Sequence, residues 1–168
     1  MTAAPDAQFP PLPPADLSDP AALARTVAWL RDRELIAALP RRYARGLDLR
    51  DFDAARAVFR DDCTVKGTLQ EAPIDAYWAG LTPGVAAYEA TMHFMGNQYV
   101  VLEPGADAGH VETYAVAHHL EAPGNGHDDL VMGVRYCDDV ARAGDDWRIV
   151  HRSVALMWAR GPLPRRAD

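Results

Sequence analysis

Lysine is nearly absent from this chain: Lys66 is the single lysine among 168 residues, and arginine carries the rest of the basic charge. Acidic residues outnumber basic ones, which gives a formal net charge of -7 at pH 7. Nucleic acids and anionic membranes both attract basic surfaces, so this charge argues against either of them as a partner.

Cysteine is also scarce. Cys63 and Cys137 lie far apart and form no CxxC or Cys/His spacing, so the sequence predicts neither a metal knuckle nor a disulfide framework. Reduced thiols of this kind are typical of a cytoplasmic protein. We expect no metal and no cofactor.

Long hydrophobic runs are missing too, since no stretch reaches the length that crosses a bilayer. The start of the chain has neither a basic nor an apolar segment of the signal-peptide kind, so we expect a protein that is not exported. With 49% apolar residues, the chain can bury one good core, which predicts a single domain.

Proline marks the boundaries of that domain. Six of the thirteen prolines fall in residues 1–20, and proline excludes regular helix and central strand, so we interpret 1–20 as an N-terminal arm. The domain then covers 21–160 and a tail 161–168. Asp19-Pro20 is a helix start, and apolar residues at helical spacing follow it as far as Leu39. We expect Pro40 to kink or restart this helix.

The rest of the chain predicts two more helices and then a sheet. A turn at Gly46-Leu47-Asp48 precedes a short helix, and a helical segment over 73–88 is interrupted at Pro83. Val, Tyr, His and Met are frequent in four strand segments separated by Gly/Asp/Pro turns: 92–102, 109–120, 129–140 and 147–158. Helices followed by an antiparallel meander indicate an α+β fold with helices packed on one face of a strongly curved sheet.

Four polar residues lie in otherwise apolar segments: Tyr43, Asp48, His93 and Arg152. A phenol, a carboxylate, an imidazole and a guanidinium that meet in one apolar cavity suit proton transfer on a hydrophobic substrate without a cofactor. We therefore expect the four side chains to converge.

Asp48 and His93 are the central pair of this hypothesis. A lone histidine in an apolar strand is often a hydrogen-bonded core residue, and an aspartate near a helix end is often an Asx-turn residue. Together, however, the carboxylate can hold the imidazole in one tautomer and raise its basicity. We predict that they form a His/Asp dyad that acts as a general base.

Tyr43 and Arg152 are the predicted assistants. Tyr43 precedes Asp48 by five residues and could donate to a leaving group or oxyanion, although helix tyrosines commonly only pack. Arg152 needs a carboxylate, a carbonyl or an anionic substrate group, because an unpaired buried guanidinium is costly. A core ion pair with Asp48 or Glu112 is the alternative. Strand alternation predicts one face shared by Arg148, Val150, Arg152, Val154, Leu156 and Trp158.

Further residues are candidates for the walls of the pocket, with core packing as their alternative reading. His118 and His119 are adjacent on a strand, so only one of them can face the pocket. One of them could also join His93 and Asp48 in an iron-binding triad, although no ligand spacing on one element supports that. The predicted substrate-binding residues are His118, Trp78, Asn97, Tyr88, Met132 and Trp158.

Three stretches resemble the SnoaL-like family of the nuclear transport factor two-like superfamily: YARGLDLRDFDAARAVFRDDCTV, ATMHFMGNQYVV and GVRYCDDVARAGDDWRIVHRSVALMW. The resemblance implies a cone-shaped curved sheet closed by helices over a deep pocket. The chain looks most similar to the cofactor-free lyases of that group, namely scytalone dehydratase, the bile-acid dehydratases and lindane dehydrochlorinase. The resemblance to these enzymes implies a His/Asp dyad at His93 and Asp48, a supporting phenol at Tyr43, the last-strand arginine at Arg152 and a second active-site histidine at His118.

The function that we expect is a cofactor-independent lyase acting on a hydrophobic, aromatic or polycyclic small molecule. Loss of water, halide or formaldehyde remains open, the last by analogy with the deformylating cleavage of lignin-derived diarylpropanes in the superfamily. The alternatives are an isomerase or cyclase of the ketosteroid or polyketide type, and a ligand-binding module without turnover. We also expect a homo-oligomer, dimer or trimer, because Ile149, Ala155 and Met157 are predicted on the sheet face opposite Arg152.

Overall fold

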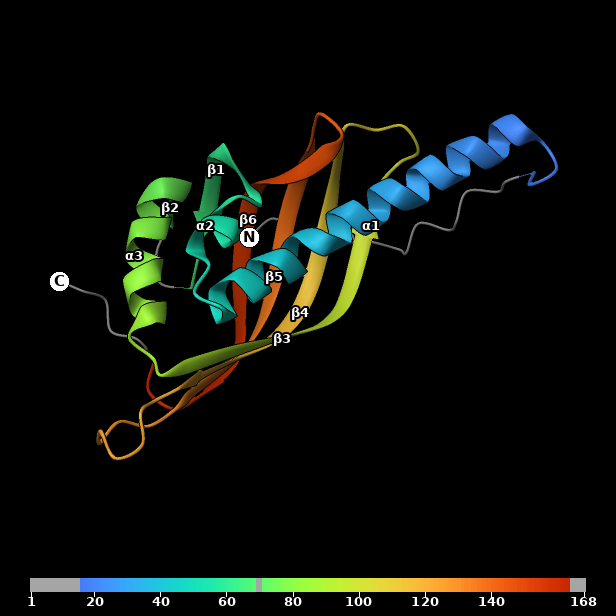
Figure 1. Cartoon of the computed structure of the whole chain (residues 1–168). Helices are drawn as coiled ribbons and strands as arrows, with labels where there is room; N and C mark the ends of the chain where they lie inside the picture. The colour runs from blue at the N-terminus through green and yellow to red at the C-terminus, as the bar shows by residue number, and fades with distance from the viewer. Residues whose placement is uncertain (1–15, 69–70, 164–168) are drawn as a thin grey trace.

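The computed structural model describes residues 16–68 and 71–163, and the predicted arm and tail fall mostly outside these ranges. The fold is α+β, as predicted, with a curved sheet partly covered by helices (Figure 1). The elements are α1 (Pro20–Asp48), α2 (Phe52–Arg56), β1 (Phe59–Lys66), β2 (Glu71–Pro73), α3 (Ile74–Ala86), β3 (Ala90–Val101), β4 (Ala108–Leu120), β5 (Leu130–Ala143) and β6 (Asp146–Arg160).

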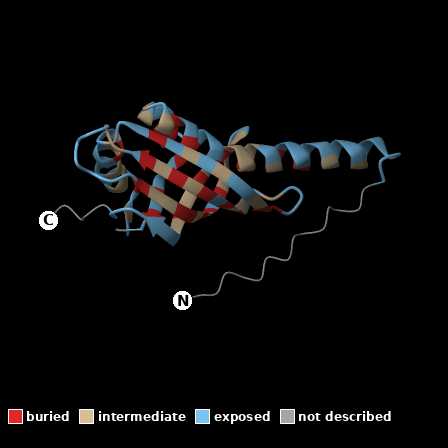
Figure 2. Ribbon diagram, turned by 90° about the horizontal axis from the view of Figure 1, so that it is seen from below, coloured by how far each residue is buried: buried red, intermediate tan, exposed pale blue. Residues whose placement is uncertain are grey.

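The six strands form one sheet in the order β2-β1-β6-β5-β4-β3. The predicted meander β3 to β6 is antiparallel throughout, whereas β1 joins the edge of β6 in parallel, so the sheet is mixed. Buried and exposed residues alternate along the strands, which Figure 2 shows as a checkerboard. The sheet therefore has an inner face towards the helices and an outer face away from them.

Helix α1 begins where the sequence predicts, because the Asp19 carboxylate accepts hydrogen bonds from Ala21 N and Ala22 N and Pro20 follows at the first position. Pro40, however, does not end it. The helix continues through Pro40 to Asp48, so a restart at Pro40 and the predicted turn at Gly46-Leu47-Asp48 are both wrong. Ile36 and Leu39 are wholly buried in the core around this point, and their packing outweighs the hydrogen bond that proline cannot make.

The predicted interruption at Pro83 is wrong as well, because α3 continues through Pro83 to Ala86.

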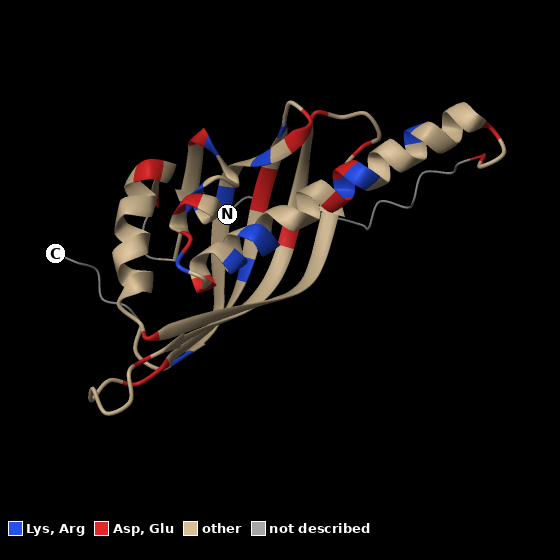
Figure 3. Ribbon diagram, in the orientation of Figure 1, with Lys and Arg blue, Asp and Glu red and all other residues tan. Residues whose placement is uncertain are grey.

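Only the C-terminal part of α1 crosses the sheet, whereas its N-terminal part projects from the body (Figures 1 and 2). Two hydrogen bonds fix the crossing: Trp29 Nε1 donates to Leu102 O at 2.8 Å and Gln98 Nε2 donates to Ala37 O at 2.9 Å. Basic and acidic positions are interspersed along α1 (Figure 3).

Two bulges in β6 change which residues face inwards. Asp139 pairs with His151 while Val140 pairs with Ile149, so Val150 is an extra residue in the strand. Ile149 is consequently wholly buried, as Arg152 is, and not on the outer face. In the predicted row, Arg148 therefore does not share the face of Arg152, and Val150 is the bulge residue between them. Ile149 does not belong to an outer surface for oligomerisation.

The second bulge lies near the end of β6. Gly133 pairs with Trp158 while Val134 pairs with Leu156, which makes Met157 the extra residue. The phase of the strand reverses again there, so Trp158 does not share a face with Arg152.

No helix among residues 16–68 and 71–163 has the length and apolar character needed to span a membrane.

Gly46 determines how closely the end of α1 approaches α2. A Cβ at Gly46 would lie 2.6 Å from the Cβ of Ala55 and 2.8 Å from its backbone nitrogen. We predict that Gly46→Ala costs about 1–3 kcal/mol of unfolding free energy, measured by urea denaturation, because the two helices must separate. Gly84→Ala in α3 is the control: a Cβ there meets nothing within 4 Å, so stability should stay equal or rise. Equal effects of the two substitutions would contradict the packing argument.

Candidate active site

Asp48 and His93 form the predicted dyad. Asp48 is the last residue of α1, and His93 lies on the inner face of β3 near its start. Nδ1 of His93 lies 2.7 Å from Oδ1 of Asp48, and the backbone N–H of His93 donates to Oδ2 at 2.8 Å. The His93 side chain is only 4% exposed and that of Asp48 is 22% exposed.

The proton positions of the dyad follow from this geometry. Burial opposes ionisation of Asp48, but hydrogen bonds from His93 and Thr91 outweigh it and hold the pKa of Asp48 below its ordinary value. An ionised carboxylate only accepts, so the hydrogen lies on Nδ1 of His93. In the neutral ring the lone pair then lies on Nε2, which can take a proton.

A second imidazole lies beside the dyad. The ring of His119 meets the ring of His93 edge to face at 5.7 Å between centroids and the ring of Tyr88 at 4.9 Å. Burial and the nearby His93 lower the pKa of His119 to about 4, so His119 is neutral at neutral pH. Nδ1 of His119 is buried and has no hydrogen-bond partner among the described residues.

The dyad borders a hollow of about 480 Å³ at the end of α1. The lining is partly basic and partly apolar, and it includes both members of the dyad. Its residues are Arg41, Ala44, Arg45, Asp48, Leu49, His93, Phe94 and Met95. Tyr43 and Arg152 are not among them.

Arg152 lies deeper in the core, in an ion pair that the sequence analysis missed. Its Nε and Nη2 donate to the two oxygens of Asp138, both at 2.7 Å, and the side chains are 1% and 0% exposed. Burial opposes the charge of Arg152, but the Asp138 carboxylate outweighs it and raises the pKa of Arg152. The expected alternative partners, Asp48 and Glu112, are therefore the wrong ones; Asp48 bonds to His93 instead.

Aromatic rings enclose this ion pair. The guanidinium carbon of Arg152 lies 4.4 Å from the ring centroid of Tyr43, 4.5 Å from that of Tyr136 and 5.0 Å from that of Phe59. Nη1 of Arg152 is buried without a partner among the described residues. The pair is thus a charged group inside an aromatic cage.

Tyr43 belongs to this cage, with its side chain in the core. Its ring packs edge to face against Phe59 at 5.7 Å and against Tyr136 at 5.9 Å. Burial raises the pKa of Tyr43 well above its ordinary value, so the phenol stays protonated.

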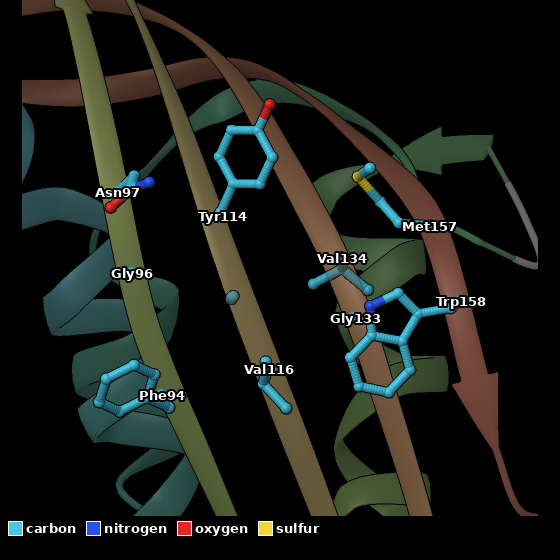
Figure 4. A pocket seen from close by; sticks show the side chains of 10 residues that line it. Phe94, Gly96, Asn97, Tyr114, Val116, Gly133, Val134, Met157 and Trp158 are labelled. Carbon is cyan, nitrogen blue, oxygen red and sulfur yellow. The ribbon is translucent and has the colours of Figure 1, made fainter.

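Three of the predicted pocket residues lie on the outer face and not beside the dyad. His118 pairs with Met92, whereas His93 pairs with Ala117, so alternation directs His118 outwards and His119 inwards. Asn97 sits at a bulge of β3, and Trp158 covers Gly133. Asn97 and Trp158 line a separate apolar hollow on the outer surface (Figure 4).

The other three predicted pocket residues face inwards. Trp78 packs 6.4 Å from Tyr43 between ring centroids, and Tyr88 reaches the dyad through His119. Met132 pairs with Ala117 on the inner face and packs against the core. Among residues 16–68 and 71–163, no three His, Cys, Asp or Glu side chains are grouped as ligands for a metal ion, so Asp48, His93 and His119 do not form such a triad.

Comparison with known proteins identifies the family. The model of the SnoaL-like domain matches residues 28–153, and the chain belongs to this family. A comparison with curated proteins found no match.

Solved structures share the fold across most of both chains. A protein of Novosphingobium aromaticivorans, provisionally named a scytalone dehydratase, has 20% identity and a TM-score of 0.73 over 85% of this chain and 95% of its own. A hexachlorocyclohexane dehydrochlorinase of Novosphingobium barchaimii has 14% identity and a TM-score of 0.67 over 84% and 97%. An NTF2-like protein of N. aromaticivorans with a cystatin-like fold has 23% identity and a TM-score of 0.68 over 84% and 92%.

The buried ion pair makes a prediction about stability. Asp138→Asn leaves the Arg152 guanidinium in the core without a counter-charge, which should cost about 3–5 kcal/mol in urea denaturation. The double variant Asp138→Leu, Arg152→Met removes both charges at similar volume and should recover most of that loss. If the double variant is as unstable as the single one, the loss does not arise from an uncompensated charge.

Proposed function

We propose that the protein is a cofactor-independent lyase in which His93, oriented by Asp48, removes a proton from carbon. The observation that carries this proposal is the dyad itself: a carboxylate fixed by several donors, and an imidazole with its hydrogen on Nδ1 and therefore its lone pair on Nε2. General base catalysis by such a group contributes about 10²–10⁴ in rate, which suffices when the C–H bond is activated by a neighbouring carbonyl, aryl or halogen group.

The reaction that fits this site is an elimination. Nε2 takes the proton, the C–H electron pair becomes the new C=C bond, and the leaving group departs from the adjacent carbon with its own electron pair. Asp48 stabilises the imidazolium that forms, and it stays ionised because its pKa is held low. The imidazolium then returns its proton to solvent or to the departed group.

Tyr43 is the proposed donor to the leaving group. Its phenol stays protonated because burial raises its pKa, so it keeps a proton that it can donate. Arg152 is committed to Asp138 through two hydrogen bonds, so its proposed part is to hold the Tyr43 ring and to offer its remaining Nη1 as an oxyanion donor.

A hydrophobic and aromatic substrate suits the surroundings of these groups. The inner face near His93 carries Ala115, Ala117 and Met132, which are all apolar, and the two alanines are small. Aromatic rings lie beyond them. Two proteins of similar fold bear the names of a dehydratase and a dehydrochlorinase, both of which denote elimination reactions. Loss of water or halide is accordingly the first reaction to test.

The test uses a β-hydroxy aryl ketone and hexachlorocyclohexane as probe substrates. We predict that His93→Ala and Asp48→Asn each lower kcat by about a hundredfold or more, followed as enone absorbance or released chloride, since the base or its orientation is lost. Met92→Ala on the outer face of β3 is the matched control, because Met92 is exposed and is not part of the hollow beside the dyad, so kcat and unfolding stability should stay similar.

Two results would decide against this reading. If His93→Ala retains the full rate on a substrate that the wild type converts, His93 is not the base. If the product in deuterated water has the mass formula of the substrate and carries solvent deuterium, the enzyme is an isomerase that uses the same dyad.

A further inference from the structure

Arg50 has an unusual backbone. Its φ is 60°, and it is the single non-glycine residue with positive φ among the described residues. This left-handed conformation is sterically unfavourable for arginine, whereas glycine or asparagine adopts it readily. Strain of this kind persists where the side chain has a task that glycine could not perform.

The guanidinium of Arg50 bridges three neutral acceptors from separate parts of the chain. Nη1 donates to Leu47 O at 3.2 Å and to Thr91 Oγ1 at 2.9 Å, and Nη2 donates to Tyr88 O at 3.0 Å. The side chain thus connects the end of α1, the segment before β3 and β3 itself.

The contact with Thr91 determines the direction of a hydroxyl. Arginine has donors but no acceptor, so the Thr91 oxygen must accept from Arg50. Its single proton is then available for Asp48 Oδ1, which lies 3.0 Å away. Oδ1 consequently receives two hydrogen bonds, one from Thr91 and one from Nδ1 of His93.

We propose that Arg50 and Thr91 form a relay that fixes the Asp48 carboxylate, and through it the tautomer and orientation of His93. Both are positioning residues, because neither touches the reacting atoms. The proposal rests on the function proposed above for its catalytic consequence, but its structural part concerns the carboxylate alone.

The physical basis of the relay is the direction of each hydrogen bond. A hydroxyl that is free to rotate has several positions for its proton, and a guanidinium that donates to its oxygen excludes the position that points at the guanidinium, which favours the one that points at Asp48. Successive donors in a chain also polarise one another and strengthen the final bond. Without the relay, Asp48 would keep its contacts to His93 but lose its third donor.

The experiment compares four variants by ¹³C NMR titration of protein labelled at the aspartate carboxyl carbon, with Asp48→Asn to assign the signal. Thr91→Val keeps the shape and removes the hydroxyl, so the pKa of Asp48 should rise from its lowered value. Thr91→Ser keeps the donor and should restore the wild-type value. Arg50→Asn tolerates the left-handed backbone but cannot reach Thr91, so it should also raise the pKa of Asp48. Arg42→Asn removes an arginine that pairs with Asp146 and should leave it unchanged.

Kinetics supply the second readout. On any probe that the wild type converts, Thr91→Val and Arg50→Asn should lower kcat by about tenfold and leave KM within about twofold, as expected for groups that orient a catalytic base. Thr91→Ser should return kcat to near the wild-type value. An Asp48 titration that is the same in Thr91→Val and the wild type would overturn the relay, as would an unchanged titration and kcat in Arg50→Asn.

The two proposals can fail separately. If neither probe is converted by the wild type but the titrations shift as described, the relay stands and the lyase assignment falls. If His93→Ala abolishes turnover while Thr91→Val leaves both the titration and kcat unchanged, the lyase assignment stands and the relay falls.

Discussion

The site depends on a carboxylate that sits where an isolated helix would disfavour it. Asp48 is the last residue of α1, at the negative end of the helix dipole, where an acidic side chain is destabilising by about 0.3–1 kcal/mol. Three donors from β3 compensate: the Thr91 hydroxyl, the His93 backbone N–H and Nδ1 of His93. The same bonds that make the acid tolerable therefore attach the helix end to the sheet and orient the base.

The strands and the dyad were accessible from the sequence, since both depend on local signals. Turn residues bound β3 to β6, and an acid after the apolar helix stripe and a histidine in an apolar strand indicated each other. The wrong assignments arise where one extra residue changes a face. The bulges at Val150 and Met157 direct Ile149 inwards and Trp158 outwards. The residue types at those two positions do not indicate a bulge.

Tertiary packing accounts for the remaining differences. Pro40 remains inside α1 because the buried Leu39 and Tyr43 hold the turns on either side of it, and Pro83 remains inside α3, where Val85 is buried just after it. Asp138 was missed although a signal existed: it alternates with Tyr136 and Val140, both buried, so an acid on that row had to find a cation. Thr91 and Arg50 carried no such signal, because their role depends on three segments meeting at one guanidinium.

The proposed function assigns separate roles to two buried polar clusters, the dyad and the ion pair of Arg152 and Asp138 with its aromatic rings. In that proposal the ionised Asp48 sets the basicity of His93, while burial keeps the Tyr43 phenol protonated although the neighbouring Arg152 cation acts in the opposite direction. His119, neutral because it is buried beside His93, adds no positive charge that would oppose imidazolium formation. Because the environments of His93 and Tyr43 differ, one group can accept a proton while the other keeps its own, as the proposed elimination requires.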